Sequence, residues 1–458
     1  MQKIRSISLV TAVLAGLALP SVALSASPAQ MDAIRASALT DQVAMDFIEG
    51  LTTEVGPRPA GTPQEARARD WAVVRLKALG FSNVRAEPYA MNVWRRGRDE
   101  ARITFPFPQN LVLAALGNSA STPAKGIEGE IVYFPTLADL EAAPEGSLKG
   151  KIAFVSHAMQ ATQDGSSYSY FGGTRRRGPS VASRKGAIAI LIRSIGTDHH
   201  RQPHTGVQIW AEGVKPIPAA ALSIPDADQL MRIIARGQPV RLRLTLTSKM
   251  LKDQPSGNVI AEIPGSDPAG GLVVAACHLD SWDQGTGAFD NASGCGIVSA
   301  AALQVAKTGA PRRTIRILMA GAEEVGGDGA RAYFTAHGKE PHAMAMESDF
   351  GADRVWRVDF RLPQNHDALA QRIGAALAPL GIATSRSPAG GGSDIEPLVQ
   401  AGVPVIDLQQ DGMRYFDIHH TPDDTLDKVN LAPLQQNVAA WTVALFEIAN
   451  AAESLGIN

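Results

Sequence analysis

The sequence predicts an α/β fold in which a mixed, largely parallel sheet is sandwiched by helices and a β-rich domain is inserted into the chain. From residue 257 onward, short apolar segments alternate with helical patterns. Strands this apolar are typical of a parallel sheet covered on both faces. Between residues 122 and 252, short β-rich segments predominate instead. A length of 458 residues also exceeds what one hydrophobic core normally serves, so we expect two domains.

The N-terminus predicts that the protein is exported. Lys3 and Arg5 precede a mostly apolar segment at 7–19, and small residues follow it up to residue 26. This is the pattern of a secretory signal peptide over residues 1–26, so we expect a periplasmic or extracellular protein. The apolar segment is short for a membrane span. We therefore expect no membrane attachment after cleavage, with a retained anchor as the alternative. A net charge of −2 argues against nucleic acid as a partner.

The main domain is expected in two segments, residues 27–121 and 253–458, on either side of the insert. Helical patterns occupy 29–50 and 63–80 of the first segment, separated by a loop rich in glycine and proline. In the second helix, apolar residues recur at helical spacing at Trp71, Val74, Ala78 and Leu79. For the insert, residues 122–252, we expect a helix at 226–236 and strands at 130–134, 151–156, 187–192 and 240–247.

The second segment of the main domain predicts the sheet itself. We expect strands at 258–263, 272–277, 314–320, 342–346 and 403–408. We expect helices at 293–307, 328–337, 365–379, 394–401 and 431–452. Active sites in such sheets lie at the carboxyl ends of the strands, so polar residues that follow the strands are the first candidates for function.

Five side chains that can bind metal ions occur in a fixed order along this part of the chain. Each stands at the end of a predicted strand or in a loop: His278, Asp290, Glu324, Asp349 and His420. This set suits a site for two zinc ions about 3.5–4 Å apart. Glu323, beside the third of them, is then free to act as a general base. Asp280 follows His278 at a spacing that lets its carboxylate orient a metal-binding imidazole.

Each of these motifs alone is more often structural. A histidine that ends a strand usually belongs to the core or surface, a Glu-Glu pair is usually solvated, and Asp-Asn-Ala-Ser-Gly is usually a turn and helix cap. Five such coincidences at successive sheet-edge positions are hard to explain in this way. We therefore favour the metal site.

Together the motifs resemble the co-catalytic di-zinc exopeptidases of clan MH, and within them the carboxypeptidase Q group. The resemblance extends over nearly all of the predicted mature chain. The matching segments are 278–283, 287–291, 323–324, 346–349 and 419–420, together with 55–58, 192–194, 203–208, 213–214 and 217–218.

The resemblance implies a role for each of these residues. His278 and Asp349 would hold one zinc ion, Glu324 and His420 the other, and Asp290 both. Glu323 would be the general base and acid. Asp349 is preferred to Glu347 from the family motif and its spacing to His420. The main domain would be the catalytic domain, the insert a protease-associated-type domain beside the active site, and the protein a homodimer, as is frequent in this family.

The expected function is that of a secreted zinc-dependent exopeptidase that hydrolyses small peptides through a metal-bound hydroxide, as a dipeptidase or carboxypeptidase. Candidate substrate contacts are His419, Tyr415 and His204, with Arg193 and the glycines at 390–392 as weaker ones. The alternatives are an aminopeptidase on longer peptides, an amidohydrolase or cyclase that uses the same site, and a binding protein without activity. An intact Glu323 argues against the last.

The sequence contains two cysteines, Cys277 and Cys295. So few cysteines in an exported protein do not form a disulfide framework. We expect two buried thiols. The alternative is one disulfide that joins the strand before His278 to the helix after Asp290.

Overall fold

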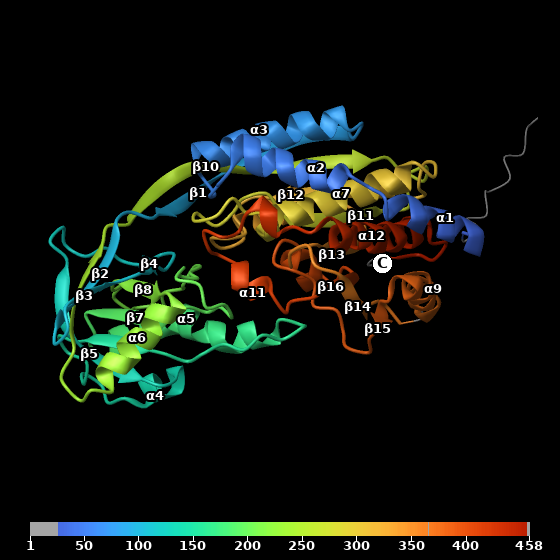
Figure 1. Cartoon of the computed structure of the whole chain (residues 1–458). Coiled ribbons are helices and arrows are strands. Elements are labelled where there is room, and N and C mark those ends of the chain that lie inside the picture. Colours follow the sequence, from blue (N-terminus) through green and yellow to red (C-terminus); the bar gives the residue numbers. More distant parts are fainter. Residues whose placement is uncertain (1–25, 365, 456–458) are drawn as a thin grey trace, which may run out of the picture.

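The computed structural model describes residues 26–364 and 366–455, which form two eight-stranded sheets with their helices (Figure 1). The predicted signal peptide lies outside the described residues, except for its last position. Within the described part of the chain, no helix combines the length and apolar character that a membrane span requires.

The first sheet is mixed, with four neighbouring parallel strands at its centre. Those four are β12 (Thr314–Ala320), β11 (Leu272–His278), β13 (His342–Glu347) and β16 (Val405–Gln410). On one side β10 (Lys249–Ile263) and β1 (Ser82–Arg95) continue the sheet antiparallel. On the other side β14 (Val355–Arg361) runs antiparallel to β16 and pairs with β15 (Ala383–Thr384).

Helices cover both faces of this sheet because its strands are apolar on both faces. Along β11, Val273 and Ala275 belong to one core and Val274 and Ala276 to another, as alternating side chains require. The first core is formed with α1 (Pro28–Ala38), α2 (Val43–Gly50), α3 (Pro63–Ala78), α7 (Ser293–Ala306), α9 (Asp367–Leu377) and α12 (Leu431–Asn450). The second is formed with α8 (Asp328–His337) and α10 (Glu396–Gln400). The predicted helical sandwich is therefore present.

Two details of the first helices differ from expectation. The segment 29–50 forms two helices, because Asp41 accepts a hydrogen bond from the backbone N of Val43 and so caps α2. In α3, the buried face is that of Ala68, Ala72 and Leu76, whereas Val74 is 69% exposed. Of the apolar pattern chosen from the sequence, Trp71 and Leu79 pack against the core, whereas Val74 and Ala78 are exposed.

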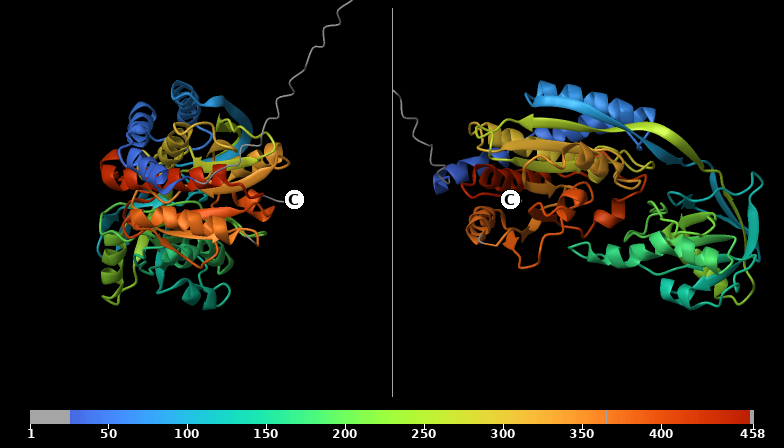
Figure 2. Two further views of the ribbon diagram at one scale, coloured as in Figure 1. Left: turned by 90° about the vertical axis from the view of Figure 1, so that its right-hand side faces the viewer. Right: turned by 180° about the vertical axis from the view of Figure 1, so that it is seen from behind.

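The second sheet lies at one end of the molecule, joined to the first by the long ribbon of β1 and β10 (Figure 2). Its strands, in spatial order, are β3 (Gln109–Leu111), β2 (Asp99–Phe105), β9 (Arg241–Leu246), β5 (Ile127–Phe134), β6 (Ile152–Val155), β7 (Ala189–Arg193), β8 (Ala219–Leu222) and β4 (Leu113–Ala115). Its helices are α4 (Leu137–Ala142), α5 (Ser166–Arg184) and α6 (Ile224–Ile234). We call residues 99–246 the second-sheet unit.

The second-sheet unit begins earlier than the expected insert. Residues 99–115, which the sequence analysis assigned to the main domain, form β2, β3 and β4 of the second sheet. Strand β2 pairs with β9, which lies far away in the sequence. Such a pairing leaves no local pattern, so the boundary at residue 122 did not follow the sheet.

Helix α5, which is not expected from the sequence, extends from the second sheet toward α11 (Tyr415–Ile418) (Figure 1). The helix contains Pro179 and several glycine and serine residues, all poor helix formers. It forms because Gly172, Arg175 and Gly178 lie on a buried face, and tertiary packing outweighs propensity.

Cys277 and Cys295 form a disulfide bond. The expectation of two buried thiols was therefore wrong, and the alternative is correct. Helix α7 packs directly against the end of β11 and brings the two Cα atoms to 5.2 Å, within the range that a disulfide spans.

Candidate metal centre

The five predicted ligands converge at the carboxyl edge of the first sheet. His278 ends β11, Glu324 follows β12, and Asp349 comes two residues after β13. Asp290 lies in η2 (Ala288–Ala292), a short segment that is kinked and not helical at this residue, and His420 follows α11. Parallel strands place their carboxyl ends at one edge, which is why residues far apart in the sequence meet here.

His278 contacts two of the carboxylates through one ring nitrogen. Its Nε2 lies 3.0 Å from Asp290 Oδ1 and 3.1 Å from Asp349 Oδ1. Its Nδ1 lies 3.0 Å from the backbone O of Asp280, so a proton on Nδ1 leaves Nε2 free for a metal ion. The Asp280 carboxylate, predicted to orient this ring, is 3.6 Å from Nδ1. The backbone carbonyl makes the closer contact.

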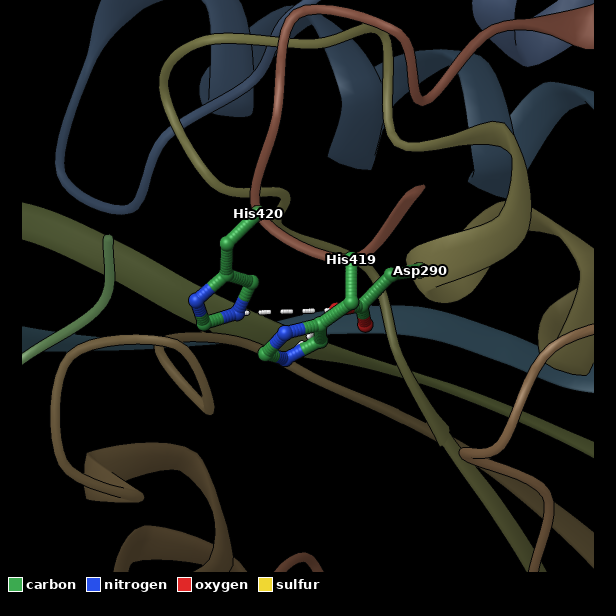
Figure 3. Close-up of side chains that lie close together, drawn as sticks. All are labelled: Asp290, His419 and His420. Atoms are coloured by element: carbon green, nitrogen blue, oxygen red, sulfur yellow. Dashed lines mark ion pairs between the residues drawn. The ribbon is translucent and has the colours of Figure 1, made fainter. Parts of the chain in front are cut away.

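His420 forms the second half of the cluster. Its Nε2 lies 2.6 Å from Glu324 Oε2 and 3.5 Å from Asp290 Oδ2, while Nδ1 contacts the Thr205 carbonyl at 3.2 Å. His419 stacks on this ring and places its own Nε2 3.6 Å from Asp290 Oδ2 (Figure 3). The two oxygens of Asp290 therefore face different histidines, which is the arrangement that a carboxylate shared by two cations requires.

The donor set fits metal ions. His278, Asp290 and Asp349 can each offer a ligand atom within 4.8 Å of the others, and so can Asp290, His419 and His420. Glu324 Oε1 is buried without a hydrogen-bond partner among the described residues. Imidazole and carboxylate are the usual ligands of zinc outside thiolate sites. His419 is the one member of these two groups that the sequence analysis did not assign as a ligand.

The pKa shifts of the carboxylates in the cluster also indicate a site for cations. Burial raises the pKa of Asp349 to about 8, and burial with the nearby charge of Asp290 raises the pKa of Glu324 well above its usual range. Burial opposes ionisation of Asp290 too, but the hydrogen bond from His278 and its charge lower the pKa of Asp290. Bound cations would remove this conflict by favouring the ionised carboxylates.

Burial and the neighbouring charges also shift the pKa values of the histidines. Burial lowers the pKa of His420 to about 4 and that of His419 well below its usual range. Both rings are therefore neutral near pH 7, the form that binds metal. Burial acts in the same direction on His278, but the charge of Asp349 and hydrogen bonds to carboxylates outweigh it and raise the pKa of His278.

Glu323 is not a member of either ligand group. Ser393 Oγ donates to its Oε1 at 2.7 Å, and its backbone N donates to Asp280 Oδ1 at 3.2 Å. Ala322, just before it, has a φ of +63°, a left-handed turn that is uncommon outside glycine. This turn follows β12 directly and aims the adjacent glutamates into one cavity.

The geometry distinguishes Asp349 from Glu347. Glu347 accepts hydrogen bonds from the backbone N of Asp394 at 2.8 Å and of Ile395 at 3.1 Å. Asp349 instead contacts His278. Glu347 thus anchors the loop before α10, and Asp349 faces the cluster.

Two buried residues hold the loop that carries Asp290. Asp424 accepts hydrogen bonds from the backbone N of Phe289 at 2.6 Å and from that of Asp290 at 3.1 Å. Arg58 donates to the carbonyls of Leu279, Thr286 and Gly287. The N-terminal motif at 55–58 therefore supports the site from behind.

A cavity of about 240 Å³ opens onto the cluster, between the first sheet and the second-sheet unit. Its lining residues are Tyr168, Arg175, Val207, Asp290, Glu323, Glu324, Asp349, Phe350, Tyr415, Phe416, His419 and His420. Two of the predicted substrate contacts, His419 and Tyr415, are thus in position to meet a ligand.

The third predicted contact, His204, lies behind the cavity wall. Its ring is buried between Asp198 Oδ1, at 3.0 Å, and the carbonyl of His419, at 2.9 Å. Arg193, a weaker candidate, pairs with Asp228 at 2.5 Å. The arginine that does line the cavity is Arg175, in the helix that the sequence analysis missed.

Comparison with known proteins gives consistent matches. Residues 258–445 match the model of Peptidase family M28. Carboxypeptidase Q of Bos taurus is 33% identical over 410 residues, which cover 88% of this chain and 85% of the relative. Carboxypeptidase Q of Homo sapiens is also 33% identical with the same coverage.

Solved structures agree with this result. A Peptidase M28 precursor from Shewanella amazonensis is 44% identical with a TM-score of 0.91, over 94% of this chain and 98% of that one. A zinc aminopeptidase from Bacillus subtilis is 20% identical with a TM-score of 0.65, over 91% and 97% of the two chains. The second match shows a common fold.

Proposed function

Because this chain belongs to peptidase family M28 and is a metallopeptidase, we propose that it is an exported, zinc-dependent exopeptidase that hydrolyses small peptides, as a dipeptidase or carboxypeptidase. The observation that carries the proposal is the position of Asp290. Its two oxygens face His278 on one side and His420 on the other, in the wall of a cavity that also contains Glu323.

Each ligand has a definite place in the proposed site. His278 and Asp349 would hold one zinc ion, Glu324 and His420 the other, and Asp290 both. When bound, two such ions lower the pKa of a water molecule and polarise the scissile carbonyl. The backbone carbonyls of Asp280 and Thr205 keep the two imidazoles turned with Nε2 toward the centre.

Glu323 moves the proton in this proposal. Its carboxylate accepts a proton from the attacking water and delivers it to the leaving amine. Ser393 holds Glu323 Oε1 through a hydrogen bond of 2.7 Å, so the carboxylate remains oriented without binding a metal itself.

The small cavity supports a short peptide as substrate. Residues of α5 and of the loop around Val207 form its wall opposite the cluster, so the second-sheet unit covers the site as a protease-associated-type domain would. Export rests on the signal-peptide pattern at residues 1–26. The homodimer stays a prediction.

One observation favours a second candidate, an aminopeptidase on longer peptides. A neighbouring cavity of about 220 Å³ is lined by Glu347, Asp349 and Ser393, among others. Carboxylates at this position suit a free α-amine, and a second cavity that shares Asp349 and Phe350 with the first would give a longer chain room to extend.

Activity on matched dipeptides tests the proposal. Free, amino-blocked, carboxyl-blocked and doubly blocked dipeptides and a longer peptide with a free amine are compared with and without a chelator, and zinc is measured on the same sample. We expect two zinc ions per chain, cleavage of the free dipeptide, and loss of activity on chelation. Preferred cleavage of longer peptides with a free amine would favour the aminopeptidase. A single zinc ion with cleavage of doubly blocked amides would favour an amidohydrolase and overturn the proposal.

A further inference from the structure

Arg175 is a buried cation in the wall of the candidate active site. It lies in α5, is 6% exposed, and lines the cavity that opens onto the metal cluster. Its Cζ atom lies 5.3 Å from the centre of the Tyr168 ring, which faces the same cavity. The second-sheet unit therefore brings one full positive charge to the edge of the site.

This charge has no counter-ion within the described part of the chain. Arg175 forms no ion pair there within 4.0 Å, its Nη1 donates to the Thr205 carbonyl at 2.7 Å, and its buried Nε has no hydrogen-bond partner. Arg58, which is fully buried, instead donates from Nε, Nη1 and Nη2 to backbone carbonyls. A buried cation with spare donors is unfavourable unless an anion reaches it.

The guanidinium is also close to the predicted metal ligands. The Thr205 carbonyl that accepts from Arg175 Nη1 lies 3.2 Å from His420 Nδ1. Gly206 stands between the two side chains. A Cβ at this position would clash with Arg175 Nη1 and lie 2.8 Å from His420 Nδ1. The absence of a side chain at this position allows the cation and the imidazole to approach.

We propose that Arg175 binds the free C-terminal carboxylate of the substrate, so that the leaving group is a single C-terminal residue. This inference rests on the proposed peptidase function and specifies its substrate class. A planar guanidinium with free N–H groups matches a carboxylate in a bidentate manner. Since the cation stands next to the cluster across one glycine, the carboxylate that it holds lies only a short distance along the peptide from the scissile bond.

Two other roles for Arg175 make different predictions. If it stabilised the oxyanion of the transition state, its loss would lower kcat for free and carboxyl-blocked substrates alike. If it served only to hold Thr205, its loss would lower the thermal midpoint and affect both substrates. A carboxylate receptor affects KM for the free substrate alone.

The test compares alanyl-alanine with its C-terminal amide on the zinc-loaded full chain. For Arg175→Gln we expect KM for alanyl-alanine to rise roughly 10- to 100-fold, the loss of a charge-assisted hydrogen-bond pair. KM for the C-terminal amide should change less than about twofold. Arg175→Lys keeps the positive charge but not the paired N–H donors of the guanidinium. Its KM for alanyl-alanine should therefore lie between those of the wild type and Arg175→Gln. Arg177→Gln is the matched control, since this arginine of the same helix is exposed and pairs with Glu141 at 3.5 Å.

Calorimetry provides a readout that does not depend on turnover. Alanyl-alanine and its amide are titrated into two inactive proteins, the Glu323→Gln variant and the double variant Glu323→Gln/Arg175→Gln. Zinc content and thermal midpoint are measured on the same samples. We expect the preference for the free carboxylate to disappear with Arg175→Gln while the other two quantities persist. Equal effects on both ligands, or none, would overturn the inference. If the wild type hydrolyses neither peptide, the proposed function fails. Calorimetry then decides by itself whether Arg175 binds a carboxylate.

Discussion

At the scale of single residues, the proposed mechanism assigns different roles to neighbouring side chains, since some would hold a metal ion and one would move a proton. Glu323 and Glu324 are adjacent, yet Glu324 contacts His420 and Glu323 contacts Ser393. The left-handed turn at Ala322 directs the pair so that each carboxylate meets different partners. This division is what a metallopeptidase needs from two neighbouring glutamates.

Replacing Glu323 tests that division. For Glu323→Gln we expect zinc content to remain at the wild-type level, because the carboxylate of Glu323 accepts a hydrogen bond from Ser393, whereas that of Glu324 contacts His420. We expect kcat to fall by roughly 10²- to 10⁴-fold, the usual loss when a general base is removed. Atomic absorption and steady-state kinetics measure the two quantities. Glu212→Gln, at an exposed position, is the control. A variant that loses its zinc would make Glu323 a ligand instead.

The metal-free protein should lose stability as the pH rises from about 6.5 to 8. Burial raises the pKa of Asp349 to about 8 and that of Asp424 to about 7, from 3.8. The folded chain then binds more protons than the unfolded chain, so these groups stabilise at low pH and lose that contribution as the pH rises through their folded pKa values. His420, with its pKa lowered to about 4, acts in the opposite sense but only below about pH 6.5.

Thermal unfolding of the chelator-treated protein measures this effect. We expect a slope on the order of 1 kcal/mol per pH unit for each carboxyl group, and a flatter profile for Asp349→Asn, which cannot ionise. Zinc should reverse the trend, because metal competes with protons for the ligands. A metal-free wild type whose stability rises over this window would contradict the assigned direction.

At the scale of elements, the site depends on how β11, η2 and α7 succeed one another. The Cys277–Cys295 disulfide ties the end of β11 to α7 and encloses the segment that carries His278 and Asp290. Arg58 and Asp424 bind the same segment through its backbone. Covalent and hydrogen-bonded constraints therefore act on the one loop that carries two of the proposed metal ligands.

The double variant Cys277→Ala/Cys295→Ala measures the covalent part. The two cysteines are 18 residues apart, and closing a loop of this size stabilises a fold by about 3 kcal/mol. We expect the free energy of unfolding in urea to fall by that order, with kcat changed much less than in Glu323→Gln. The single variants, which leave one free thiol, serve as comparison. Unchanged stability would mean that the remaining contacts of α7 are sufficient by themselves.

At the scale of the whole molecule, the cavity exists only because the two sheets are held together. The ribbon of β1 and β10 connects them. Arg96, the residue that follows β1, pairs with Asp283 of the first-sheet part at 2.7 Å and with Asp99 of β2 at 3.0 Å. Trp282 Nε1 donates to Thr205 Oγ1 at 2.7 Å. These contacts place α5, and with it Arg175, opposite the cluster.

Weakening this junction should loosen the cavity without removing zinc. Arg96→Gln loses both ion pairs, so we expect KM for a dipeptide to rise several-fold and proteolysis near residues 95–99 to accelerate, while zinc content stays constant. Kinetics, limited proteolysis and atomic absorption provide the three readouts. Arg98→Gln is the control, because this exposed arginine contacts the exposed Glu100 at 3.7 Å and the Ala124 carbonyl at 3.4 Å, both within the second-sheet unit. Equal behaviour of the two variants would show that the ribbon alone positions the units.

The sequence alone was sufficient for the family, the metallopeptidase activity and the order of the central strands and helices. Apolar strands that alternate with helices have local signatures, and the five candidate ligands stand in motifs of specific local sequence around β11, β12, β13 and α11. The comparisons confirm the family and the enzyme class, and the structure brings the five side chains together.

Only the tertiary structure decided the rest. It pairs β2 with β9, which moves the boundary of the second-sheet unit to residue 99, and it joins Cys277 to Cys295. It also places Arg175 in the wall of the cavity at the cluster and His204 behind that wall. None of these follows from a local pattern, because each depends on a contact between segments distant in the sequence. Helix α5 is the clearest case, since its composition disfavours a helix and packing alone makes it one.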